Sequence, residues 1–179
     1  MNAEKYTQKS LAAVKDAQEL TIKNQNQQIE QIHLLSALLQ QDGGLVPQLL
    51  KKMGITVESL NAAVNQELSK LPRVTGSGRE ADKYYVSRDV DAALTKAESI
   101  AEGMKDDFVS VEHLLLALIE CPDATVKELF RTYNITKEAC LKTLQTIRGN
   151  QRDTTDSPED TYVELEKYLP ALVKHSRGQ

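Results

Sequence analysis

The sequence predicts an all-α fold built from a duplicated four-helix unit. Aromatic residues make up only 4% of the chain and β-branched residues seldom alternate with polar ones, so strand signals are few. Apolar residues recur at helical spacing almost throughout. A shift of 80 residues also places the first half on the second without a gap. Because one half alone buries too little apolar surface, we expect the copies to pack about a pseudo-twofold axis.

Repeat one, residues 1–72, is expected to contain four helices. The first runs from its N-cap Thr7 to Lys23, and the second ends before Gly43 and Gly44. A short third helix spans about 47–53, and Thr56 caps a fourth that ends before Pro72. The expected inward positions are Leu11, Val14, Ala17 or Gln18, and Leu20 in the first helix, Ile32, Leu35, Ala37, Leu38 and Leu39 in the second, and Leu60, Val64 and Leu68 in the fourth.

Repeat two, residues 87–149, matches repeat one in its central apolar helix and in a later cap. His33-Leu-Leu-Ser-Ala-Leu-Leu39 falls on His113-Leu-Leu-Leu-Ala-Leu-Ile119, and Ile55-Thr56 falls on Ile135-Thr136. Residues 73–86 between the copies contain Gly76-Ser-Gly78 and are predicted to be a partly flexible linker. These glycines are no nucleotide-binding loop, because no Gly-Lys pair occurs in the chain. Residues 1–149 are therefore expected to form one domain.

Residues 150–179 are predicted to be a linker with a partial helix. The segment Ser157-Pro158-Glu159-Asp160 combines a cap, a proline at the first helical position and two acids at the positive end of the dipole. The expected apolar positions are Tyr162, Leu165, Tyr168 and Leu169, before an interruption at Pro170.

Composition and charge exclude several classes of function. With 22 basic and 26 acidic residues and a net charge of −4, the chain lacks the surplus of cations that nucleic-acid binding requires. No run approaches the ~20 apolar residues of a membrane span, and the N-terminus has no signal peptide, so we predict a cytoplasmic protein. Cys121 and Cys140 match no zinc or redox spacing and are expected to be free thiols.

Nothing in the spacing of polar residues predicts an enzyme or a metal site. His33 and His113 are related by the repeat, and we expect both to fill space and bond a loop carbonyl, while His175 lies in a polar tail. No Ser/His/Asp or Cys/His arrangement can be assembled locally. Glu112 leaves two interpretations open, a solvated acid at a helix N-terminus or part of an acidic rim around an apolar cleft. Its counterpart in repeat one is Ile32, so the two copies differ there.

Several blocks of the sequence resemble the N-terminal domain of Clp ATPases. They are Ile29-Glu-Gln-Ile-His33-Leu-Leu-Ser-Ala-Leu38 and Phe108-Val-Ser-Val-Glu112-His113-Leu-Leu-Leu-Ala-Leu118. Within that family, the opening at 6–10 and the segments at 26–30, 71–78 and 148–152 are most similar to ClpB-type protein disaggregases. The resemblance covers about residues 4–168. It ends at Leu169-Pro170-Ala171, where those chains continue toward a first AAA+ module, so we expect both ATPase modules to be absent here.

The resemblance implies a substrate-binding module, not a catalyst. Such a domain captures exposed apolar segments of unfolded or aggregated proteins in a shallow groove and passes them to a hexameric AAA+ chaperone, whose ATPase modules alone would need ATP and Mg²⁺. By motif position, the polar members of the site are Thr7, Asp106 and Glu112, and the apolar members are Tyr85, Val90, Phe108 and Val109. For the apolar members, ordinary core packing remains the alternative.

Other members of the family imply alternative partners. In ClpC-like domains an acid before the histidine of each repeat holds phosphoarginine, and here Glu112 retains that acid whereas Ile32 does not. Docking of an adaptor protein, as in ClpA-like chaperones, and a purely structural spacer are the remaining alternatives. Charge reversal of Glu112 is expected to weaken client binding and to leave a spacer unaffected.

Overall fold

The computed structural model describes residues 1–74 and 85–163. In repeat one the elements are η1 (Ala3–Lys5), α1 (Gln8–Lys23), β1 (Gln28–Ile29), α2 (Gln31–Gln40), α3 (Leu45–Lys52) and α4 (Val57–Ser69). In repeat two they are β2 (Tyr85–Val86), α5 (Arg88–Gly103), α6 (Val111–Glu120), α7 (Ala124–Thr132) and α8 (Lys137–Arg148). The predicted helical fold with four helices in each copy is confirmed. The two-residue strands were not predicted, because so short a strand leaves no alternation in the sequence.

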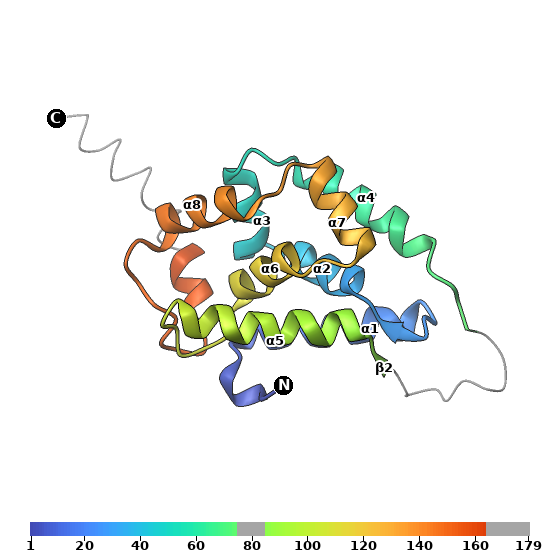
Figure 1. The fold of residues 1–179 in the computed structure, drawn as a ribbon, viewed down its shortest axis with the longest axis horizontal. Coiled ribbons are helices and arrows are strands. Elements are labelled where there is room, and N and C mark those ends of the chain that lie inside the picture. The colour runs from blue at the N-terminus through green and yellow to red at the C-terminus, as the bar shows by residue number, and fades with distance from the viewer. Residues whose placement is uncertain (75–84, 164–179) are drawn as a thin grey trace.

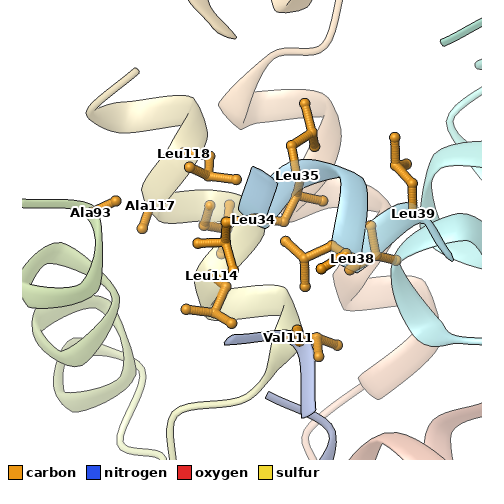
Figure 2. Packing of buried hydrophobic residues seen from close by; sticks show 14 of the residues in the cluster. Leu34, Leu35, Leu38, Leu39, Ala93, Val111, Leu114, Ala117 and Leu118 are labelled. Atoms are coloured by element: carbon orange, nitrogen blue, oxygen red, sulfur yellow. The ribbon is translucent and has the colours of Figure 1, made fainter. Parts of the chain in front are cut away.

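The two central helices, α2 and α6, lie side by side at the centre of the molecule and are surrounded by the others (Figure 1). Both are apolar almost all round, as expected for helices with neighbours on every side. Figure 2 shows leucines of α2, including Leu34 and Leu38, beside Leu114 and Leu118 of α6. Each fully buried leucine contributes about 1.5–3 kcal/mol of hydrophobic stabilisation, so this contact between the repeats is the centre of the fold.

The buried side of α1 differs from the predicted stripe of large residues. Leu11, Val14 and Leu20 are only partly buried, whereas small residues form the buried face. The buried positions are Ser10, Ala13, Ala17 and Thr21 in α1, and their equivalents Val90, Ala93, Ala97 and Ala101 in α5. Small side chains allow α1 to approach α2 and α5 to approach α6 closely, and these two helix pairs make extensive contact.

The predicted pseudo-twofold relation also appears in how the chain crosses between the repeats. β2, at the start of repeat two, pairs in parallel with β1 of repeat one, with Val86 opposite Ile29. Tyr6, at the start of repeat one, forms the equivalent bridge with Val109 of repeat two. Adding 80 to Ile29 gives Val109 and subtracting 80 from Val86 gives Tyr6, so the two pairings are equivalent. Each repeat is therefore tied to its partner by the segment that precedes its first helix.

After α8 the chain returns to repeat two. A helical segment begins at residue 158, as the Ser157-Pro158 signal predicted, and is described to residue 163. Pro158, Glu159 and Tyr162 of this segment are buried. The predicted linker at 75–84, Leu165, Tyr168, Leu169 and His175 lie outside the described residues, and the domain boundary at residue 149 stays a prediction.

Two smaller features complete the fold. No helix in the described parts of the chain is both long and apolar enough to cross a membrane. The thiols of Cys121 and Cys140 are free, and that of Cys140 is buried in α8. Burial raises the pKa of Cys140 to about 12, which makes it an unreactive structural thiol.

Candidate functional site

The histidine of repeat one is part of a neutral hydrogen-bonded turn. The His33 ring is buried, its Nδ1 accepts from the backbone N–H of Glu30 at 2.9 Å, and its Nε2 lies 2.8 Å from Asn26 Oδ1. Since Nδ1 accepts, Nε2 carries the proton and donates it to Asn26. Burial lowers the pKa of His33 to about 4, so the ring is neutral at pH 7. This arrangement fits the predicted structural role, although the ring's partners are a backbone N–H and a side-chain oxygen, not a loop carbonyl.

The equivalent turn of repeat two carries charge. His113 Nδ1 accepts from the backbone N–H of Ser110 at 2.9 Å, and its Nε2 lies 2.7 Å from Asp106 Oδ2. Asp106 also accepts from both terminal nitrogens of Arg148, at 2.6 and 3.1 Å. Burial opposes ionisation of Asp106, but the bonds from His113 and Arg148 outweigh it and lower its pKa to about 2. Asp106 is therefore a permanently charged, fully paired carboxylate.

Glu112 is neither solvated nor on a rim, which corrects both interpretations of this residue. Its side chain has no exposed surface, and its Oε2 lies 3.4 Å from Arg148 Nη1. Its Oε1 has no hydrogen-bond partner among the described residues. Burial, followed by the charge of Asp153, holds the pKa of Glu112 well above its usual range. The carboxyl group of Glu112 therefore has no surface that a ligand could contact directly.

Two further carboxylates reach the same place from the segment after α8. Glu159 Oε2 accepts from the Thr7 hydroxyl at 2.5 Å and from the backbone N–H of Val111, at the start of α6, at 3.2 Å. Asp153 Oδ1 accepts from the hydroxyl of Tyr162 at 2.6 Å. We define the buried ionic cluster as Asp106, Glu112, Arg148, Asp153 and Glu159; all five are buried.

Sequence reasoning did not identify three members of this cluster, Arg148, Asp153 and Glu159, as site residues. Arg148 offered a signal, because it lies on the buried side of α8 with Cys140, Leu144 and Ile147. An arginine on an apolar helix face predicts a buried anion opposite it. The ring of Tyr162 covers the guanidinium, with its centroid 5.4 Å from Arg148 Cζ.

The donor atoms of Asp106, His113 and Asp153 lie close enough together, within 4.8 Å of one another, to suggest a cation site. Their chemistry does not fit one. Both oxygens of Asp106 accept from Arg148, and the Nε2 of His113 is bonded to Asp106. A divalent ion would have to displace or adjoin the guanidinium, whose positive charge repels it. The cluster is built to hold an arginine.

A second feature lies on the adjacent surface, where η1 meets α5 and the loop before α6. There an open cleft of about 680 Å³ is lined by Met1, Asn2, Lys5, Glu98, Ala101, Glu102, Lys105, Asp106, Asp107, Phe108 and Val109. Phe108 and Met1 supply most of its apolar surface, since Val109 and Ala101 are almost fully buried, and acids outnumber lysines among the polar lining residues. Among the described residues that line the cleft there is no histidine, cysteine or serine.

The structure divides the predicted site residues between these two features and the rest of the fold. Phe108 and Val109 line the cleft, and Asp106 belongs to both the cleft lining and the buried ionic cluster. Glu112 lies within the cluster, and Thr7 bonds to its member Glu159. Val90 is 3% exposed and packs in the core, and Tyr85 is 62% exposed on β2, outside the residues that line the cleft. A role of these residues in ligand binding stays a prediction.

Comparison with known proteins places this geometry in context. Residues 5–133 match the family model described as the Clp repeat (R) N-terminal domain. The chaperone protein ClpB of Bacillus anthracis is 40% identical over 97% of this chain, and that of Clostridium tetani is 37% identical over 99%. The chain spans about 20% of the length of either relative. The crystal structure of the Hsp104 N-terminal domain from Candida albicans is 25% identical, with a TM-score of 0.75 over 86% of this chain and 98% of that one.

Proposed function

The chain belongs to the Clp N-terminal domain family, and we propose that it captures exposed apolar segments of unfolded or aggregated proteins in the cleft beside Phe108 and Val109. We propose further that it does so as the client-binding module of a hexameric ATP-dependent chaperone, since its ClpB relatives are about five times longer. In that arrangement ATP and Mg²⁺ serve the ATPase modules, and this module catalyses no reaction. The observation that carries the proposal is the composition of the cleft.

The cleft has the physical properties that an unfolded client requires. An unfolded chain presents extended apolar side chains in no fixed sequence, and an open cleft with an apolar floor accepts them without demanding a particular shape. Phe108 is half-buried and Val109 is buried, so the floor is held by the core beneath it. Such a contact contributes about −5.5 to −7 kcal/mol, a Kd of roughly 10–100 μM, which suits capture and release.

The charged rim of the cleft adds a preference among clients. Glu98, Glu102 and Asp107 supply the rim's acidic groups, against Lys5 and Lys105. Lysine and arginine often flank apolar segments, and an acidic rim attracts them at long range. The rim of this cleft therefore carries three acids and two lysines, and Glu112 is not one of them.

The burial of Glu112 bears on the alternative of phosphoarginine recognition. To bind a guanidinium, its carboxylate would have to be reachable from solvent, whereas it has no exposed surface and faces Arg148. The matching position in repeat one is Ile32, which carries no charge. These two observations favour a client over a phosphoarginine ligand. Adaptor docking remains an outcome of the experiment below.

The test is a two-dimensional amide NMR titration of the chain with reduced, carboxymethylated lactalbumin, a permanently unfolded polypeptide. Shifts are expected at Ala101 and over 105–109, and native lactalbumin should cause none. Shifts located elsewhere, or equal shifts with the native control, would contradict capture through this cleft. An absence of shifts at several hundred micromolar would leave adaptor docking or a spacer as the function.

A charge-reversal pair tests the rim. Glu102→Lys is expected to weaken binding of the unfolded polypeptide severalfold, and more strongly at low salt, because it removes an acid from the cleft and adds a cation. Glu19→Lys is the matched control, since Glu19 is an exposed acid of α1 outside the cleft. Equal effects of the two variants would show that net charge, not the rim, controls binding.

A further inference from the structure

We propose that residues 153–163, the C-terminal clamp, hold the cleft-lining loop 106–109 in its binding shape, so that docking of the clamp and binding of a client strengthen each other. Glu159 and Asp153 are then positioning residues for the cleft. This inference rests on the proposed function, because it assigns the segment a role in the same site.

The clamp is hydrogen-bonded directly to the loop that lines the cleft. The carbonyl oxygen of Asp153 accepts from the backbone N–H groups of Asp107 and Phe108, at 2.9 and 3.2 Å. In return, the backbone N–H of Asp153 donates to Asp106 Oδ1 at 2.8 Å. Three consecutive cleft-lining residues are thus bonded to one residue of the clamp. If the clamp undocks, these groups lose their hydrogen-bond partners and the loop is no longer held in one conformation.

The clamp is also anchored at the starts of two helices, α1 and α6. Glu159 bonds Thr7 at the start of α1 and Val111 at the start of α6. Asp153 Oδ2 accepts from the Ser110 hydroxyl at 2.7 Å, next to the same helix start. The clamp therefore spans both segments, Lys5–Thr7 and 106–111, whose pairing forms this side of the cleft.

The charge interactions of the docked clamp contribute little net free energy, because it buries more acidic groups than the single guanidinium can pair. The cluster brings the carboxyl groups of Asp106, Glu112 and Asp153 within 4 Å of one guanidinium and adds the buried carboxyl group of Glu159. Glu112 Oε1 and Glu159 Oε1 have no hydrogen-bond partner among the described residues. Burial of such groups costs free energy that their pairing only partly returns. Burial also raises the pKa of Glu159, which reports the same cost. The docked and undocked states of the clamp are then close in free energy, so a ligand of modest affinity can shift the equilibrium between them.

Linkage makes the coupling reciprocal. If the docked clamp tightens the cleft by a given factor, then a bound client stabilises the docked clamp by the same factor. In the relatives the chain continues past this segment, so the clamp lies where the module leads into the rest of a longer chain. Occupancy of the cleft would then be transmitted to that continuation as a change in how firmly the clamp is docked.

The experiment compares three variants of the full chain. Glu159→Ala removes the anchor, Glu159→Gln retains an oxygen that accepts from Thr7 and Val111, and Asp160→Ala removes an exposed acid from the next position. Hydrogen exchange of the amides at 159–163 reports docking, and titration with reduced, carboxymethylated lactalbumin reports the cleft. We expect Glu159→Ala to accelerate exchange about tenfold and weaken binding about fivefold, with Glu159→Gln and Asp160→Ala close to wild type.

The outcomes separate this inference from the proposed function. Unchanged exchange in Glu159→Ala would refute the anchor, and faster exchange with unchanged affinity would refute the coupling while leaving client binding intact. Absence of binding by the wild-type chain would refute the proposed function and the coupling together. At saturation, the polypeptide must slow amide exchange at 159–163 in the wild type by the same factor by which docking of the clamp tightens binding. Tyr162→Phe, which removes only the bond to Asp153, should act in the same direction with a smaller effect.

Discussion

The two repeats build the same turn around a histidine, one from neutral groups and the other from charged groups. In both, Nδ1 accepts from the N-cap backbone and Nε2 meets a side-chain oxygen seven residues earlier. The partner is Asn26 in repeat one and Asp106 in repeat two. The differences between the copies, in the order repeat one and repeat two, are Asn26 and Asp106, Ile32 and Glu112, Leu68 and Arg148, and Arg73 and Asp153.

This difference shows that duplication preserved the backbone geometry while the polar content of the copies diverged. The backbone at Gln25 and Lys105, one residue before each histidine's partner, has positive φ in both repeats. Repeat two has an ionic cluster where repeat one has neutral groups around its histidine, and the cluster binds the segment that follows α8. The charged copy is therefore the one that joins the cleft to the C-terminal segment.

The largest effect is expected from converting Arg148 to its counterpart, Arg148→Leu. Removal of the guanidinium leaves the buried carboxylates of Asp106, Glu112 and Asp153 without their cation, and breaking such a pair costs about 3–5 kcal/mol. Urea denaturation at pH 7 measures this loss in the free energy of unfolding.

A triple variant provides the control for that prediction. Asp106→Asn and Glu112→Ile added to Arg148→Leu give repeat two the neutral groups that repeat one has at these three positions. Only Asp153 then stays without the cation, so we expect part of the lost stability to return. If the triple variant is no more stable than Arg148→Leu, the ionic balance is not the cause of the loss.

The next largest effect concerns pH and repeat one. The pKa of His33 is about 4 in the folded chain, against 6.5 for an ordinary histidine. Between these values the unfolded state binds a proton that the folded state does not, so the free energy of unfolding falls as pH falls, by about 3 kcal/mol in all. The acids with raised pKa, such as Glu112, oppose this trend, because the folded state holds their protons more tightly.

The Asn26→Asp variant isolates the contribution of His33 to this pH dependence. It places beside His33 a carboxylate like that of Asp106, the counterpart of Asn26 in repeat two. A charged partner favours the imidazolium, so stability should depend less on pH between 6.5 and 4 in this variant. Urea denaturation of both proteins at several pH values gives the two slopes. Identical slopes would show that His33 is not the titrating group.

A smaller contrast is expected at the two equivalent N-caps, Thr7 and Ser87. Each accepts a backbone N–H three residues later, and each hydroxyl is also bonded to a glutamate, but Glu159 beside Thr7 is buried whereas Glu30 beside Ser87 is only partly buried. We expect Ser87→Ala to cost about 1 kcal/mol and Thr7→Ala about 2 kcal/mol in thermal or chemical denaturation. In a Glu159→Ala background the cost of Thr7→Ala should fall to that of Ser87→Ala or below it, and an unchanged cost of Thr7→Ala would argue against the Glu159 bond as its source.

The smallest effect is on binding alone. Phe108 corresponds to Gln28 of repeat one, and Phe108→Gln should weaken binding of an unfolded polypeptide about tenfold with little change in stability, because it removes apolar floor from the cleft. Leu141→Gln is the matched control, since Leu141 is 37% exposed on α8, outside the residues that line the cleft. Isothermal titration separates the two, and equal affinities would place the binding surface elsewhere.

The sequence alone determined the helices, their order and the duplication, because these depend on local periodicity, caps and self-similarity. The cap at Thr7, the helix start at Ser157-Pro158 and the equivalence of His33 with His113 were all readable from neighbouring residues. Even the divergence at Ile32 and Glu112 could be read from the chain.

Only the tertiary structure decided which charged side chains are buried and which groups they pair with. Arg148 and Asp106 are separated by 42 residues, and a helical pattern shows which way a side chain faces but not which group it meets. Glu112 was therefore predicted at the surface, since an acid in a helix's first turn is normally solvated, whereas the returning segment 153–163 buries it. The pairing of each repeat's first strand with the other repeat has the same origin, because two-residue strands are fixed by the packing of α2 against α6 and not by their own sequence.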